Sequence, residues 1–195
     1  SGIAVGYDFH FGKGRSGSPT LLTAEAPRLG IDVHVEPHFD IHSRAVSSSA
    51  IRAALSAGQI DEANAMLGYP WFATSQVIHG EKRGRELGYP TANMALNGLH
   101  LPRFGVYAVK VDVLTGPHAG AYMGAASLGV RPMFAGEVPN LETFILDFKG
   151  DLYGHHISVA LVDFLRPELK FDGLPALITQ MDADCARARD ILAAL

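Results

Sequence analysis

Apolar and polar positions change their spacing near the middle of the chain. In the second half, apolar residues alternate with polar ones over several short stretches, most clearly in 105–114 and 156–165. A period of two is typical of half-buried β-strands. Five strands are predicted between glycine and proline turns, at 72–79, 105–114, 120–128, 141–148 and 156–165. This regular spacing predicts an antiparallel barrel or sandwich.

The end of the chain has the period of a helix instead. Within 174–195 the apolar residues Leu177, Met181, Ala188 and Leu192 recur on one helical face. We expect this helix to pack its apolar face against the barrel.

The first half alternates short apolar segments with helical patterns. Strands are predicted at 3–7 and 31–36, and helices at 20–29, 47–55 and 60–67. This alternation favours a parallel α/β arrangement. Two strands make a small sheet, so this half is interpreted as the tail of a larger α/β domain. A boundary near Gly68 predicts two domains, 1–68 and 69–195.

Composition narrows the class of protein. Nearly half of the 195 residues are apolar, which is enough for a buried core. The net charge of −4 and the absence of a basic run disfavour nucleic acid as a partner. One cysteine, Cys185, permits no internal disulfide and predicts a cytoplasmic location. No apolar run has the length of a membrane span, and no oligomeric state is predicted.

A loop with three glycines and several basic residues occupies 80–88. Gly80, Gly84 and Gly88 permit tight turns and close approach of a ligand, while Arg83 and Arg85 add positive charge. Such a loop can surround phosphate groups. A solvated hairpin turn with basic side chains is the alternative, and the spacing alone favours that alternative.

The residues after this loop, Pro90-Thr91-Ala92-Asn93, add oxygen ligands. In an extended segment Thr91 and Asn93 point to the same side. A hydroxyl and an amide oxygen suit Mg²⁺, which usually completes its shell with waters and phosphates. The alternative is an ordinary capped turn, where threonine and asparagine are common.

The segment 88–93, following the glycine-rich loop, resembles the nucleotide-binding signature of riboflavin kinases. Further elements of that family follow in order, at 105–107, 129–134, 141–148, 151–154 and 165–171. Several motifs in the right order over about 120 residues make a chance match improbable. The resemblance implies a six-stranded antiparallel β-barrel with a C-terminal helix, in agreement with the strand pattern.

The resemblance also implies a reaction and roles for its residues. It implies that ATP, with Mg²⁺, phosphorylates riboflavin to FMN, and that the partners are these two small-molecule substrates. Thr91 and Asn93 match the metal-binding pair. Glu142 matches the catalytic base. On the strand pattern Glu142 shares a face with Phe144 and Leu146, and Asp147 lies on the other face; without the resemblance the two carboxylates are equal candidates.

The first half resembles the later motifs of the FMN adenylyltransferase domain found in bacterial bifunctional FAD synthetases. The resemblance rests on 5–17 and 47–52, and it implies that Ser49 and Arg52 contact ATP phosphates at a helix start. The fold class expected for the chain is therefore a Rossmann-like nucleotidyltransferase tail followed by the barrel. The chain contains no His-x-Gly-His motif, so we expect a truncated domain and an incomplete adenylyltransferase site.

Three positions depart from the kinase pattern. Ser127 stands where asparagine is usual, Met133 where threonine is usual, and Lys82 where aspartate or asparagine is frequent. Two alternatives to a riboflavin kinase therefore stay open. One is a non-catalytic flavin-binding barrel, and the other is FMN adenylyltransferase activity in the intact protein.

Overall fold

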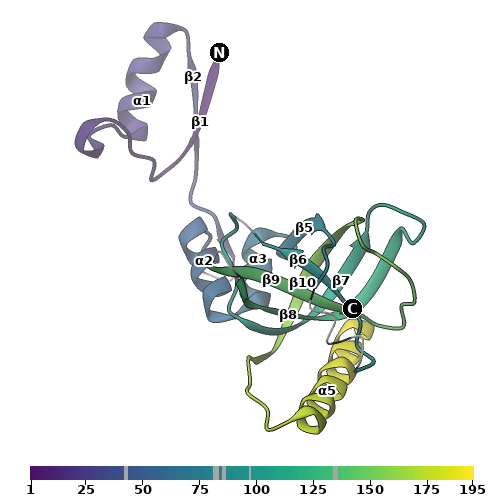
Figure 1. Cartoon of the computed structure of the whole chain (residues 1–195). Coiled ribbons are helices and arrows are strands. Elements are labelled where there is room, and N and C mark those ends of the chain that lie inside the picture. The colour runs from purple at the N-terminus through teal and green to yellow at the C-terminus, as the bar shows by residue number, and fades with distance from the viewer. Residues whose placement is uncertain (42–43, 81–83, 85–86, 97, 134–135) are drawn as a thin grey trace. The chain divides into compact units, whose positions relative to one another are not determined.

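A computed structural model describes residues 1–41, 44–80, 84, 87–96, 98–133 and 136–195 (Figure 1). The chain divides into two compact units, Ser1–Ser47 and Ser48–Leu195. Within the described residues, no helix is both long enough and apolar enough to span a membrane.

The first unit is a small α/β arrangement. Strands β1 (Gly2–Gly6) and β2 (Asp32–Glu36) pair in parallel, as the alternating pattern predicts. Helix α1 (Pro19–Glu25) connects them and begins after Ser18, whose Oγ accepts a hydrogen bond from the Leu21 amide. A 3₁₀ turn lies on each side of α1, and two short strands end the unit. These elements are η1 (Lys13–Arg15), η2 (Ala26–Leu29), β3 (Asp40–Ile41) and β4 (Arg44–Ala45).

The second unit is built around a six-stranded antiparallel sheet in the order β5-β10-β7-β8-β9-β6. The sheet curls into a nearly closed barrel. An isolated bridge from Ile78 to Asn93 links the two edge strands, with Ile78 N 2.9 Å from Asn93 O. We call this junction the seam. The strands are β5 (Phe72–Gln76), β6 (Thr91–Ala95), β7 (Gly105–Val113), β8 (Gly120–Met133), β9 (Gly136–Ile145) and β10 (His156–Pro167).

Alternate residues of these strands fill the barrel. The inward face is mainly apolar and buried along the long strands, because a period of two places every second side chain inside. Its largest fully buried side chains include Tyr107, Val109, Val111, Leu128, Leu141, Ile157 and Leu161. Burial of this kind stabilises the barrel by about 25 cal/mol for each Å² of apolar surface removed from water.

Among the described elements, α2, α3 and α5 pack against the barrel. Helices α2 (Ser48–Ala57) and α3 (Ile60–Leu67) add Leu55, Ile60 and Ala63 to the main core. The side chain of Asn64 joins α3 to the barrel, donating to Leu161 O at 2.9 Å and accepting from Trp71 N at 2.7 Å.

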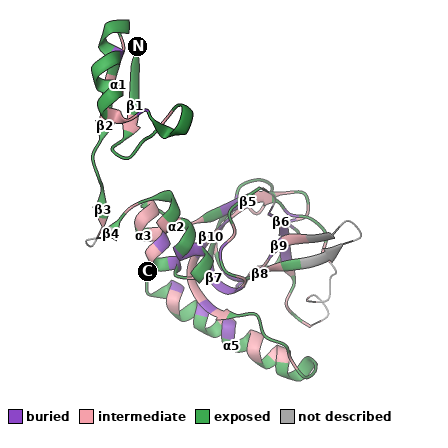
Figure 2. Cartoon of the chain, turned by 90° about the vertical axis from the view of Figure 1, so that its left-hand side faces the viewer, coloured by how far each residue is buried: buried purple, intermediate pink, exposed green. Residues whose placement is uncertain are grey.

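The C-terminal helix α5 (Leu174–Ala193) packs on the outside of the barrel through one buried stripe (Figure 2). Ala188 and Leu192 lie in a second apolar cluster with Leu165. Near the middle of the helix, Asp184 forms a part-buried ion pair with Arg166 of β10 at 2.8 Å. The predicted α/β tail, antiparallel barrel and C-terminal helix are thus all present.

The end of β9 differs from the prediction. The strand was expected to continue to Phe148 but ends at Ile145, where the Leu146 amide turns to bond Met123 O at 2.8 Å. Asp147 then adopts a left-handed conformation with φ of 57°. The assignment of Leu146 to one strand face and Asp147 to the other is therefore wrong.

The limits of the two compact units also bear on the predicted domain boundary. Helices α2 and α3 belong to the unit that contains the barrel. The predicted boundary near Gly68 says where one domain of the sequence ends and the next begins, and it does not say which helices pack together. It stays a prediction, and truncation of the chain can test it.

Candidate functional site

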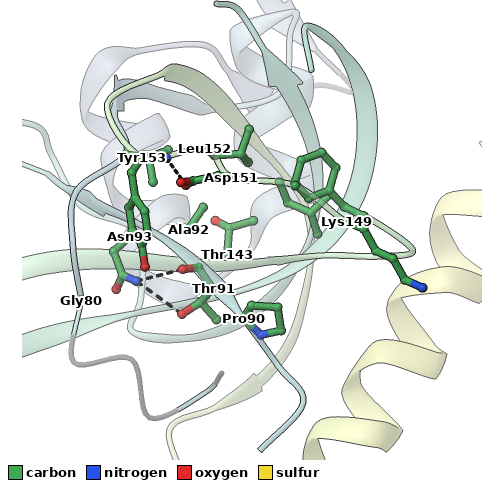
Figure 3. A pocket seen from close by; sticks show the side chains of 14 residues that line it. Gly80, Pro90, Thr91, Ala92, Asn93, Thr143, Lys149, Asp151, Leu152 and Tyr153 are labelled. Carbon is green, nitrogen blue, oxygen red and sulfur yellow. Dashed lines mark hydrogen bonds between the residues drawn. The ribbon is translucent and has the colours of Figure 1, made fainter. Parts of the chain in front are cut away.

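A pocket with a volume of about 190 Å³ lies at the seam of the barrel (Figure 3). Its lining comes from the end of β5, from β6, from β9 and from the loop that joins β9 to β10. Pockets that enclose a drug-sized ligand usually measure about 300–1,000 Å³. This pocket can therefore enclose only a part of a nucleotide. The lining residues are Val77, Gly80, Pro90, Thr91, Ala92, Asn93, Thr143, Ile145, Phe148, Lys149, Gly150, Asp151, Leu152 and Tyr153.

Thr91 and Asn93, the predicted metal-binding pair, lie side by side at this pocket. The Asn93 amide nitrogen donates to Thr91 O at 3.1 Å and to Thr91 Oγ1 at 3.3 Å (Figure 3). Asn93 is buried and Thr91 half-buried. Both side chains are on the face of β6 that points away from the barrel core, because Ala92 and Met94 point inward.

Glu142, the predicted base, is joined to the same polar group. It lies directly opposite Asn93 in the pairing of β9 with β6. Asn140 bridges the two residues, since its amide nitrogen donates to Asn93 Oδ1 and to Glu142 Oε1, both at 3.3 Å. Asn140 is buried and Glu142 half-buried. The structure thus brings a carboxylate, a hydroxyl and two amides together on adjacent strands.

The glycines of the preceding loop are required by close contacts. A Cβ on Gly80 would lie 2.6 Å from the Asn93 amide nitrogen, and one on Gly84 would lie 2.3 Å from Tyr89 O. Gly88 has a φ of 85°, which favours glycine. Arg83 and Arg85, the predicted cationic residues of this loop, lie outside the described residues.

Tyr89 connects the segment before β6 to the C-terminal helix. Its hydroxyl donates to Asp182 of α5, and its ring packs edge-on against Phe144 with ring centroids 5.0 Å apart. This hydrogen bond, with burial, raises the pKa of Tyr89 to about 12. In the same helix, burial raises the pKa of Cys185 to about 11, so its thiol stays protonated at neutral pH and is a poor nucleophile.

The loop after β9 forms an aromatic wall of the pocket. Asp151 Oδ1 accepts a hydrogen bond from the Tyr153 amide at 3.0 Å, which shapes the turn. The Tyr153 ring lies against His79, with centroids 3.9 Å apart. Phe148 is held by edge contact with Tyr122 at 5.2 Å. Phe148, Asp151 and Tyr153 belong to the sequence elements 141–148 and 151–154, but sequence reasoning gave them no role in a site.

Sequence reasoning also missed Thr143 and Asn140. Thr143 is fully buried, lines the pocket and faces away from Glu142 along β9. The alternation around Glu142 could have placed Thr143 on the opposite face, but its contact with a pocket depends on the seam, which brings β5 beside β6.

Residues Ser49 and Arg52, predicted from the adenylyltransferase motifs, lie on the first turns of α2. Both are exposed, and Arg52 Nη2 donates to Ser49 Oγ at 3.4 Å. Ser127, one of the departures from the kinase pattern, is exposed on β8 directly opposite Glu142. A short hydroxyl thus takes the place of the usual amide beside the carboxylate.

The donor set at Thr91 and Asn93 fits Mg²⁺. A hydroxyl oxygen, an amide oxygen and a nearby carboxylate are ligands that this ion accepts, and substrate phosphates normally complete its shell. In the described geometry the amide nitrogen of Asn93 faces Thr91. Half a turn of the amide would present Oδ1 there instead, since the two amide atoms are nearly isosteric, and Asn93 would then give up the hydrogen bond that its Oδ1 accepts from Asn140.

Comparison with known proteins places this geometry in a family. Residues 67–192, which contain the whole barrel and α5, match the family described as riboflavin kinase. The chain belongs to the riboflavin kinase family. Residues 1–50 match a second family, described as FAD synthetase. The riboflavin kinase domain therefore includes the pocket and the polar group of Thr91, Asn93 and Glu142.

Curated relatives cover both parts of the chain. The chain is 37% identical over 195 residues to the bifunctional riboflavin kinase/FMN adenylyltransferase of Listeria monocytogenes, covering 99% of this chain and 60% of the relative. It is 39% identical over 192 residues to the enzyme of the same name from Pseudomonas fluorescens, with 98% and 60% covered. The chain thus spans about three fifths of the length of these relatives.

A solved structure shares the fold. The crystal structure described as a macrolide-efflux protein from Streptococcus pneumoniae superposes with a TM-score of 0.77 at 34% identity. The match covers 92% of this chain and 57% of that chain. A similarity of this extent shows that the two chains share one architecture, while the function of each rests on its own site.

Proposed function

We propose that this chain is an ATP-dependent riboflavin kinase that converts riboflavin and ATP to FMN and ADP. The observation that carries the proposal is the group formed by Thr91, Asn93 and Glu142 on adjacent strands beside the seam pocket, within a riboflavin kinase domain. Phosphoryl transfer requires positioning and charge stabilisation more than covalent chemistry; this group would position the acceptor hydroxyl and hold the Mg²⁺ that stabilises the charge.

In the proposed reaction, the oxygen of the ribityl 5′-hydroxyl forms a bond to the γ-phosphorus, and the bond from that phosphorus to the bridging oxygen of ADP breaks. Glu142 orients the hydroxyl and accepts its proton, which then passes to solvent. Asn140 holds the carboxylate toward Asn93 through its amide. The half-buried position of Glu142 suits this role, because the group must meet a substrate while keeping its own partners.

The nucleotide is proposed to bind across the seam. Thr91 and Asn93 would hold Mg²⁺, which neutralises charge on the β- and γ-phosphates when bound. The amides of the loop at Gly80, Gly84 and Gly88, together with Pro90 and the side chains of Arg83 or Arg85, are proposed to surround the phosphates. A cytoplasmic location is part of the proposal, since one cysteine permits no internal disulfide.

Incubation of the chain with riboflavin, ATP and Mg²⁺ tests the proposal, with the flavin products separated by chromatography. We expect FMN in amounts that grow with enzyme concentration. Riboflavin binding without consumption of ATP would instead identify a non-catalytic flavin-binding barrel, and the kinase proposal would be wrong.

We propose a second activity, FMN adenylyltransferase activity, only for a protein of this kind that is as long as these relatives. The match of residues 1–50 to FAD synthetase favours FMN adenylyltransferase activity in an intact protein of that kind. In this setting Ser49 and Arg52, at the start of α2, would contact ATP phosphates. Conversion of FMN and ATP to FAD by the longer protein, lost on substitution of Arg52 by alanine, is the result that this proposal requires.

A further inference from the structure

Strand pairing holds Thr91, the first residue of β6, from one side. Thr91 pairs with Phe144 of β9. On the other side of β6, in the described part of the chain, the bridge to the segment after β5 lies two residues further on, between Ile78 and Asn93. Thr91 is proposed to hold the metal, so its position matters for the reaction. A second support at this point would therefore have a functional effect.

A stiff connection joins Tyr89 to Thr91. The ring of Pro90, between them, fixes its φ, and a residue that precedes proline is restricted to extended conformations. The Tyr89 amide donates to Gly84 O at 2.7 Å, which closes a turn. A Cβ on Gly84 would lie 3.9 Å from Thr91 Oγ1, so this turn lies close to the Thr91 hydroxyl. Because the connection is stiff, a contact that holds Tyr89 also holds Thr91.

Two elements hold the side chain of Tyr89. Its ring packs edge-on against Phe144, with centroids 5.0 Å apart, and its hydroxyl donates to Oδ1 of Asp182 on α5. Helix α5 packs its apolar stripe on β7, β8 and β10. Asp182 therefore connects a helix that is seated elsewhere on the barrel to the strand that begins at Thr91.

The fold itself depends little on Asp182. The residue is exposed and lies outside the apolar stripe of α5. An exposed hydrogen bond contributes modestly to stability, because water solvates both groups when the bond breaks. The bond nevertheless restricts the direction of the Tyr89 side chain, and this restriction is what Thr91 requires.

We infer that Asp182 is a positioning residue of the kinase site, which fixes Thr91 relative to Glu142 by accepting the hydrogen bond of Tyr89. The inference rests on the proposed function, because it takes Thr91 as a ligand of the Mg²⁺ that accompanies ATP. It gives α5 a part in the reaction, although none of the helix residues that the structure describes lines the pocket.

Steady-state kinetics of the chain and its variants tests the inference, with FMN formation measured well below the thermal midpoint of every protein. Y89F removes the donor and keeps the ring, and D182A removes the acceptor. Each is expected to lower kcat/KM for Mg-ATP about 3- to 10-fold, because Thr91 is less often in place. The Mg²⁺ concentration that gives half the maximal rate should rise by a similar factor, while the KM for riboflavin stays within about twofold.

Four further proteins separate positioning from a structural role. D182N keeps an oxygen that accepts from the phenol, so its kcat/KM should stay within about twofold of the parent's. The double variant Y89F/D182A should be no worse than either single variant, because both remove one hydrogen bond. In the background of T91A, Y89F should have no further effect, since the bond acts through Thr91. D190A, which removes another exposed carboxylate of α5, is the matched control and should equal the parent.

The inference is overturned if Y89F and D182A lower the thermal midpoint but keep the parent's kcat/KM and Mg²⁺ requirement, because the bond would then serve the fold alone. Additive losses in the double variant, or a further loss from Y89F in the T91A background, would overturn it as well. A parent that makes no FMN would refute the proposed function and the inference with it, whereas an active parent with unchanged variants refutes the inference alone.

Discussion

At the scale of single residues, the candidate site is a row of four hydrogen-bonded polar side chains on two adjacent strands. Thr91 Oγ1, the Asn93 amide, the Asn140 amide and the Glu142 carboxylate follow one another at 3.3 Å separations. Each side chain restrains the position of the next through a hydrogen bond, so a substitution of Thr91 can shift the Glu142 carboxylate. Coupling of this kind makes matched variants more informative than single ones.

Replacement of Thr91 by alanine should act on the nucleotide and not on the flavin. We expect Thr91→Ala to lower kcat/KM for Mg-ATP by about 10- to 100-fold, because it removes an oxygen that contacts a charged group. Riboflavin affinity should change little. Thr74→Ala, which alters an exposed threonine of β5, is the matched control. Equal turnover of Thr91→Ala and the parent at saturating Mg²⁺ would show that Thr91 is no ligand.

Replacement of Glu142 by glutamine should stop chemistry while leaving binding intact. Loss of a general base typically lowers kcat by about 10²–10⁴-fold. Glutamine keeps the size of the side chain and can still bond Asn140. Binding of both substrates, measured by titration, should therefore stay near that of the parent.

Asp147→Asn is the control carboxylate for that experiment. Asp147 lies beyond the end of β9, has a side chain that is 81% exposed, and pairs with Arg189 of α5 at 3.1 Å. Exposed ion pairs contribute little to stability. Its kcat should therefore match that of the parent. If Asp147→Asn loses turnover and Glu142→Gln keeps it, the base has been placed at the wrong carboxylate.

The sequence could predict most of the polar residues of the site but not their partners. Thr91, Asn93 and Glu142 stand in motifs that a reader of the sequence finds. Asn140 lies outside the motifs and Thr143 was given no role within its motif, because the importance of both comes from burial and from the strands beside them. A contact between strands is a tertiary property, and no local pattern reports it.

At the scale of elements, strand prediction succeeded where alternation was long and failed where it was short. The nine residues of β7 alternate clearly and were predicted within one residue. Strand β6 has five residues after a proline turn, and it exists because β9 pairs with it. At the end of β9, alternation continues through Leu146 and Asp147, yet the chain turns there because aspartate tolerates a positive φ.

The contact of Tyr89 with α5 belongs to this scale, because it connects the segment before β6 to the C-terminal helix. Tyr89→Phe removes the hydrogen bond to Asp182 and should lower the thermal midpoint by about 2–4 °C. The folded protein raises the pKa of this phenol, so its contribution is complete below the pKa of the unfolded tyrosine, about 10, and is lost as the pH approaches 12.

Thermal unfolding of the parent and Tyr89→Phe between neutral pH and pH 10 measures this effect. The difference between the two midpoints should stay constant over that range. A difference that shrinks already near pH 8 would mean that the phenol does not donate to Asp182 in the folded protein.

At the scale of the whole molecule, the barrel depends on two helices that precede it. The core includes Leu55 and Ile60, and Asn64 forms hydrogen bonds with Trp71, just before β5, and with Leu161 of β10. A protein of residues 69–195 lacks all three. We expect its thermal midpoint to lie at least about 5 °C below that of residues 48–195, given the apolar surface it would expose.

Scanning calorimetry of the two truncated proteins measures this difference. Equal midpoints would show that the barrel domain begins after Gly68, as the sequence predicts. A lower midpoint for 69–195 would move the boundary to the start of α2. Sequence alone cannot decide between them, because α2 and α3 resemble helices of either domain and only their packing assigns them.

The seam has a consequence for how a bound substrate affects the stability of the barrel. In the described part of the chain, β5 and β6 are joined through one isolated bridge, whereas the other neighbouring strands of the barrel pair along their length. The pocket is lined by Val77 and Gly80 on one side of the seam and by Thr91 and Asn93 of β6 on the other. A substrate bound there would contact both sides, so we expect it to hold β5 and β6 together and to raise the thermal midpoint of the barrel.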